Sequence, residues 1–135
     1  VSGSPMVALR NVAYQLALAW LMGNGDLHAK NVSVVRKNGH FDVAPIYDIP
    51  STLPYGDTTL ALTIQGRRDG LSLKKYFEYT DEVGLPRSIA ERTAAAALAA
   101  TKDADERLIN ATAFDARRAR DIRRVLRARR KMWGE

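Results

Sequence analysis

The segment Gly23–Asn31 reads Gly-Asn-Gly-Asp-Leu-His-Ala-Lys-Asn, and it separates a predicted helix before it from a predicted hairpin after it. Its two glycines and Asn24 favour positive φ, so they should end whatever helix precedes them. A helix is predicted over Pro5–Met22, where apolar side chains recur at helical spacing and Pro5 suits a first turn. The chain is therefore expected to leave this helix and enter a polar loop at Asp26.

A β-hairpin is predicted directly after the loop. Val32–Arg36 is rich in β-branched residues, Lys37–Gly39 contains the Asn-Gly turn signal, and His40–Ala44 is the returning strand. A turn-rich stretch follows over residues 49–58, and Thr59–Ile64 is expected to be β-prone. The remainder should be helical, over Leu73–Val83, Ser88–Ala100, Asp103–Asn110 (separate or continuous with its neighbour) and Phe114–Trp133. The layout predicts a mainly α (α+β) fold in a single domain, residues 1–135.

Composition limits the classes of protein to consider. With 135 residues, 46% of them apolar, the chain can build a real core. It has no cysteine, so neither disulfides nor a thiolate metal site can hold the fold. The longest apolar run, Val12–Met22, is too short to span a bilayer, and the first residues lack the pattern of a signal peptide. A cytoplasmic protein without membrane contact is expected.

Three polar residues could carry chemistry together: Asp26, Asn31 and Asp48, the last lying just past the hairpin. Phosphoryl transfer from ATP needs a carboxylate that orients the attacking hydroxyl, and it needs oxygen ligands for Mg²⁺. An Asp-x4-Asn loop, a hairpin and a further Asp follow one another in the order used by protein kinases. The plainer alternative is that all three residues only form turns or cap their own backbone.

The amino-acid sequence around these residues resembles that of the HipA-like serine/threonine kinase toxins. Gly23–Asn31 looks like the catalytic loop of that family, and Val43–Thr52, reading Val-Ala-Pro-Ile-Tyr-Asp-Ile-Pro-Ser-Thr, is similar to its metal-binding segment. The likeness extends through Leu60–Gly66 and is dense over Asn11–Gly66. Gly-Asp-Leu-His is also similar to the aminoglycoside and choline kinases. The resemblance implies the helical C-lobe of a protein kinase-like fold, with its hairpin next to the catalytic loop.

The resemblance also implies a role for each polar residue of the site. Asp26 would be the catalytic base that positions a substrate hydroxyl, while Asn31 and Asp48 would hold Mg²⁺ on the phosphates of ATP. His28 and Lys30 could contact the γ-phosphate. Alternatively, His28 is a loop histidine bonded to a backbone carbonyl, and Lys30 is simply solvated.

The function implied is a Mg-ATP-dependent serine/threonine protein kinase of a toxin–antitoxin module. Its protein substrate would be an aminoacyl-tRNA synthetase, as is typical of the family. No Gly-rich phosphate-binding loop precedes Gly23, so the N-terminal ATP-binding lobe is expected to be absent and the isolated C-lobe to be inactive. The alternatives are a non-catalytic interaction module that binds an antitoxin, an N-lobe or a nucleic acid, and a small-molecule kinase of the aminoglycoside type.

The net charge of +6 is concentrated at the C-terminal end. Residues 114–133 contain nine basic and two acidic residues, so this predicted helix carries more positive charge than the whole chain. Arginines there could contact DNA, RNA or an acidic partner; the candidates are Arg117, Arg120, Arg124 and Arg127. The alternative is a solvated helix whose arginines pair with acids elsewhere in the protein.

Overall fold

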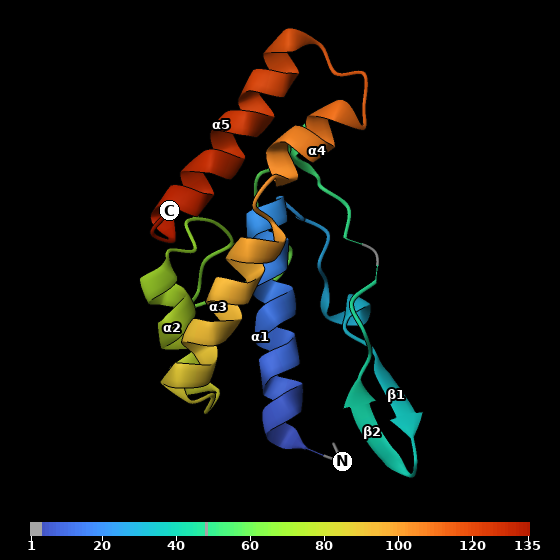
Figure 1. The fold of residues 1–135 in the computed structure, drawn as a ribbon. Coiled ribbons are helices and arrows are strands. Elements are labelled where there is room, and N and C mark those ends of the chain that lie inside the picture. Colours follow the sequence, from blue (N-terminus) through green and yellow to red (C-terminus); the bar gives the residue numbers. More distant parts are fainter. Residues whose placement is uncertain (1–3, 48) are drawn as a thin grey trace.

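The computed structural model describes residues 4–47 and 49–135. Its described elements are α1 (Pro5–Met22), η1 (Ala29–Asn31), β1 (Val34–Lys37), β2 (His40–Val43), η2 (Leu53–Tyr55), α2 (Leu73–Glu82), α3 (Arg87–Ala100), α4 (Ala104–Asn110) and α5 (Ala116–Met132). Figure 1 shows α1 at the centre of the helices, with the hairpin β1–β2 projecting to one side. The mainly α prediction with one small antiparallel sheet is confirmed.

Helix α1 forms the centre of the hydrophobic core, and it ends at the candidate catalytic loop. It begins at Pro5, with the Ser4 hydroxyl accepting a hydrogen bond from the Val7 N–H, and it ends at Gly23, whose φ of 68° is left-handed. Between Ala13 and Leu21 every side chain except that of Tyr14 is buried, as expected for a helix surrounded by protein. The predicted bounds are confirmed.

Helix α3 packs closely along α1 because it presents alanine where the two meet. Ala90, Ala94 and Ala97 are all at most 3% exposed, and side chains this small let the two backbones approach. On another side of α1, the Tyr76 hydroxyl of α2 donates to the Ala13 carbonyl at 3.2 Å. The Tyr76 ring also packs on that of Trp133, which follows α5. One core therefore joins both ends of the chain.

The hairpin β1–β2 is antiparallel, and its turn follows the predicted Asn-Gly signal. Asn38 and Gly39 have φ of 51° and 82°, the left-handed pair that lets a two-residue turn match the twist of the strands. The strands are shorter than predicted, Val34–Lys37 and His40–Val43. The predicted β character of Thr59–Ile64 is wrong: these residues form a loop with a single bridge from Ile64 to Arg67.

The C-terminal half matches the helices predicted for it to within two residues at each end. Asp103–Asn110, left open in the sequence, contains a separate helix, α4, which lies alongside α5 (Figure 1). Within the part of the chain that the structure describes, no helix combines the length and apolarity needed to cross a bilayer.

Candidate functional site

The loop after α1 is held in shape by its own side chains. Gly23 ends the helix in a left-handed conformation. The next residue, Asn24, is buried, and its side-chain oxygen accepts a hydrogen bond from the Asp26 N–H at 2.9 Å. A short amide that bonds two residues ahead is a standard way to fix a turn. This hydrogen bond fixes the backbone at Asp26.

Gly25 allows a second segment of the chain to pack directly on this loop. A Cβ built on it would lie 2.5 Å from Thr52 Oγ1 and 2.7 Å from the Thr59 carbonyl oxygen, so no larger residue fits without a shift. Its N–H instead donates to Thr52 Oγ1 at 2.9 Å. Asp57 also lies against Gly25, since a Cβ there would be 2.9 Å from Asp57 Oδ2. Hydrogen bonds from the Thr59 backbone and hydroxyl lower the pKa of Asp57 below its usual value.

Asp26, His28 and Asn31 form one connected cluster. His28 Nε2 lies 3.1 Å from Asp26 Oδ1, and both side chains are about half exposed, at 46% and 54%. The His28 N–H donates to Asn31 Oδ1 at 3.1 Å as well as to the Asp26 carbonyl at 2.9 Å. The partner of the His28 ring is thus the Asp26 carboxylate, rather than the backbone carbonyl considered from the sequence. The arrangement offers an accessible carboxylate whose position is set by an imidazole.

The remaining predicted site residues are less constrained. Lys30 belongs to the short helix η1 and is exposed, with no ion pair to a carboxylate of the described residues. Asp48 lies outside the described residues, so its predicted role as a metal ligand stays a prediction. That prediction assumed a β-hairpin between the loop and Asp48, and the antiparallel pair β1–β2 is that hairpin.

The donor chemistry of the described cluster fits Mg²⁺. This ion takes hard oxygen ligands and commonly binds through one or two protein groups together with phosphates. Asn31 Oδ1 has a second lone pair besides the one that accepts from His28, so it remains able to ligate a cation. Over residues 4–47 and 49–135, no group of three or more His, Cys, Asp or Glu side chains could hold a metal ion, so a centre built only from those residue types is not indicated there.

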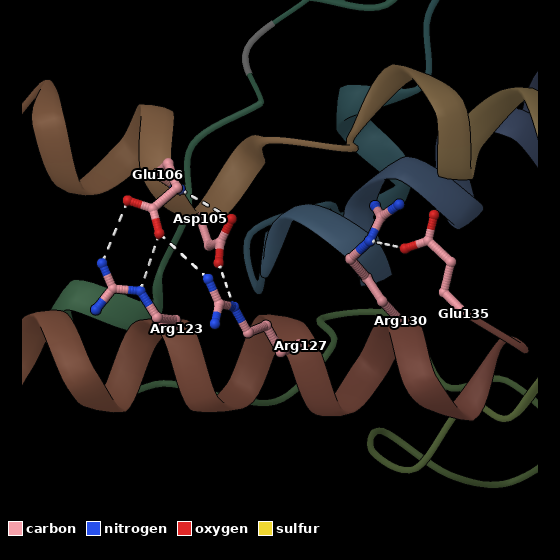
Figure 2. A network of polar contacts seen from close by, with 6 residues as sticks. All are labelled: Asp105, Glu106, Arg123, Arg127, Arg130 and Glu135. Carbon is pink, nitrogen blue, oxygen red and sulfur yellow. Dashed lines mark hydrogen bonds and ion pairs between the residues drawn. The ribbon is translucent and has the colours of Figure 1, made fainter.

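Half of the eight arginines of the basic helix α5 bond to other parts of the chain. Figure 2 shows Arg123 and Arg127 directed at the acidic first turn of α4. Arg123 binds both carboxylate oxygens of Glu106, at 3.1 and 3.3 Å, and Arg127 reaches Asp105 at 2.8 Å and Glu106 at 3.2 Å. Arg127, predicted to contact a partner, is therefore occupied within the chain, as the alternative from the sequence supposed.

The other predicted contact arginines differ in how freely they could act. Arg124 pairs with Asp121 one turn away at 3.2 Å, with 78% of its side chain exposed. Arg117 and Arg120 are exposed and form no ion pair with a carboxylate of the described residues. The surface still available to a partner is therefore the N-terminal half of α5.

Two groups that support the site were not singled out in the sequence. Thr52 and Asp57 lie against Gly25 in the loop after α1, and Arg129 joins α5 to α1 and to the segment beside the loop: it donates to the Trp20 carbonyl at 2.8 Å and to the Thr58 carbonyl. Its guanidinium also lies 3.9 Å from the centre of the Trp20 ring. The signal that could have found it is helical spacing: Arg129 follows Ile122 and Leu126 on the same inward face of α5.

Comparison with known proteins agrees with this architecture. Residues 1–105 match the HipA-like C-terminal domain family. A Haemophilus influenzae protein described as "Putative kinase" is 39% identical over 83 residues, which is 56% of this chain but 24% of that protein. The HipA chain of a Shewanella oneidensis toxin–antitoxin complex with HipB and operator DNA superposes with a TM-score of 0.66 at 20% identity, over 92% of this chain and 31% of that one. The chain thus spans less than a third of either relative, and it belongs to the HipA-like C-terminal domain family.

Proposed function

We propose that this chain is the catalytic C-lobe of a Mg-ATP-dependent serine/threonine protein kinase that works in a toxin–antitoxin module. The observation that carries the proposal is the cluster of Asp26, His28 and Asn31, whose loop is held by hydrogen bonds from the Asp26 N–H and the His28 N–H to asparagine side chains. Membership of the HipA-like family supports it, and so do the Haemophilus relative described as a kinase and the toxin–antitoxin setting of the Shewanella structure.

In the proposed reaction, Asp26 orients the hydroxyl of a substrate serine or threonine and accepts its proton. His28, 3.1 Å away, would help to orient the Asp26 carboxylate in a reaction that depends on positioning. Asn31, with Asp48 as the proposed second ligand, would hold Mg²⁺, which neutralises phosphate charge when bound. Lys30 and His28 are the proposed contacts to the γ-phosphate.

The hairpin supports the proposal that a second lobe completes the ATP site. Val34, Val43 and Phe41 share one face of the sheet with Arg36 by its register, yet Val34 is 64% exposed and Phe41 is 42% exposed. A two-stranded hairpin with an uncovered apolar face is marginal by itself. Its place next to the catalytic loop in the sequence suits a lobe that carries the phosphate-binding loop.

The test of the catalytic assignment is Asp26→Asn in the complete kinase that contains this lobe. Phosphotransfer from γ-labelled ATP to an aminoacyl-tRNA synthetase, and to the kinase itself, should fall by about 10²–10⁴-fold, since general-base catalysis is worth that much. The matched control is Asp103→Asn, which removes an exposed carboxylate between α3 and α4. It should leave the rate unchanged.

Two outcomes would count against the assignment. If Asp26→Asn transfers phosphate at the wild-type rate, Asp26 is not the base. If the 135-residue chain shows no heat of binding with Mg-ATP and neither Asn31→Ala nor Asp48→Ala changes nucleotide binding by the complete kinase, these residues are not the metal ligands. The non-catalytic interaction module would then be the better description.

A further inference from the structure

A cleft of about 640 Å³ separates the short helix η2 from the first half of α5. One wall is residues 53–58, and the other is the first three turns of the basic helix. Tyr55 is among the lining residues and is 88% exposed. Tyr55 lies one turn from Thr52, which accepts the Gly25 N–H, so this wall is continuous with the segment that supports the catalytic loop.

The cleft combines an apolar floor with an aromatic rim. Leu53 and Ile122 are buried at its base, and Val125 packs beside them. Tyr55 lines the same cleft and is largely exposed to water. Aromatic and arginine side chains around a small apolar depression are typical of the residues that dominate protein interfaces.

The wall contributed by α5 carries cations that packing does not use. Arg117 and Arg118 lie in the first turn, where the helix dipole disfavours positive charge, and neither forms an ion pair with a carboxylate of the described residues. Asp115 lies nearby, but its carboxylate caps the helix by accepting the Arg118 N–H at 2.8 Å. That hydrogen bond is the main reason that the pKa of Asp115 is lowered, and the nearby charges of Arg118 and Arg117 lower it further. Two arginines at an unfavourable helix position suggest an anionic partner.

The same wall also discriminates between kinds of anion. Asp115 and Asp121 line the cleft together with the arginines, and Asp121 pairs with Arg124. A nucleic acid backbone presents regularly spaced phosphates and would place some of them against these carboxylates. A peptide can instead place separate acidic side chains at the arginines and an apolar side chain over Leu53.

We propose that the cleft between η2 and α5 binds an acidic peptide segment that carries an apolar side chain. Arg117, Arg118 and Arg124 pair with its carboxylates, and Tyr55 covers its apolar residue. The further step, that this segment belongs to the protein substrate and is held next to the catalytic loop, rests on the proposed kinase function. The binding itself does not.

The test uses the full chain and fluorescence anisotropy with a labelled synthetic peptide that alternates glutamate pairs with leucine. Binding should weaken with salt, and it should weaken about tenfold or more in Arg117→Gln/Arg118→Gln and several-fold in Tyr55→Ala. The matched control is Arg36→Gln/Lys37→Gln, which removes the same charge from the exposed strand β1. It should bind as the wild type does, and so should Asp26→Asn.

Three results would overturn the proposal: equal weakening in the strand control, unchanged binding in the cleft variants, or a labelled DNA duplex that displaces the peptide with the same arginine dependence. Urea unfolding of every variant shows whether a loss of binding reflects a loss of fold. Because the assay contains no ATP, a failure of the kinase assignment would leave this result standing. Phosphotransfer to a synthetase then tests the further step: Arg117→Gln/Arg118→Gln should raise its KM more than it lowers kcat.

Discussion

The two ends of α5 use the same residue type for different purposes. Near the C-terminal end, Arg129 and Arg130 are 4% and 9% exposed and donate to backbone carbonyls and a threonine hydroxyl. Near the N-terminal end, Arg117 and Arg118 are exposed, without ion pairs to the described carboxylates. Between them, Arg123 and Arg127 lie against the acidic turn of α4 (Figure 2).

This gradient shows that a helix with nine basic residues need not be a polyanion-binding helix along its whole length. Burial lowers the pKa of Arg129 to about 10, yet the group remains charged at neutral pH because the starting value is so high. A charge so placed is tolerated only because carbonyl dipoles and the face of Trp20 replace its water. The arginines of α5 that are exposed and form no ion pair with a described carboxylate therefore all lie in its N-terminal half.

The largest effect on stability is expected from Arg129→Met. This change keeps the apolar stem but leaves the Trp20 and Thr58 carbonyls without their donor, so the free energy of unfolding should fall by about 3 kcal/mol. Urea denaturation followed by circular dichroism measures it. Arg117→Met is the matched control and should stay within about 0.5 kcal/mol. A loss below about 1 kcal/mol in Arg129→Met would remove the contrast between the two ends.

A smaller loss, about 2 kcal/mol, is expected from Arg130→Gln. The arginine donates to Thr101 Oγ1 at 2.8 Å and to the Leu98 carbonyl at 3.0 Å, joining α5 to the end of α3. Glutamine is too short to reach both acceptors, and the ion pair with Glu135 is lost as well. Hydrogen exchange should show the end of α3 opening more often. Unchanged exchange there would mean that α3 is held by its contacts with α1 alone.

Next in size is the pairing of α5 with α4. A double-mutant cycle of Arg127→Gln and Asp105→Asn should give a coupling of about 1 kcal/mol or less, because Arg127 is 61% exposed and water screens the pair. The coupling should shrink further in 1 M salt. A coupling above about 2 kcal/mol would mean that Arg127 stabilises the fold as strongly as the buried arginines at the C-terminal end of α5.

The smallest effect is expected from Arg117→Gln/Arg118→Gln. Because cations near a helix N-terminus oppose the dipole, their removal should leave the melting temperature unchanged or raise it slightly, by an amount equivalent to about 0.5 kcal/mol. Differential scanning calorimetry at low salt is the measurement. A clear fall in melting temperature would show that these arginines stabilise the fold, and the case for a partner at this end would weaken.

Much of the fold could be predicted from short stretches of adjacent residues. The Asn-Gly turn and the bounds of Pro5–Met22 could be predicted because left-handed backbone and helix caps depend on a few adjacent residues. Thr59–Ile64 could not be predicted in this way. Its β-branched residues find no partner strand, and the segment is held instead by contacts such as Leu60 N–H to the Arg68 carbonyl at 2.7 Å.

For the candidate site, the sequence alone determined the order of chemical groups: a carboxylate at Asp26, a carboxamide at Asn31, a hairpin, and then the carboxylate of Asp48. Only the tertiary structure decided that His28 turns to Asp26, that Thr52 packs on Gly25, and that Arg129 is buried while Arg117 is not. The reason is physical. Residue types and spacing fix what a short segment can do, whereas burial and partners depend on segments that meet in space from distant parts of the chain.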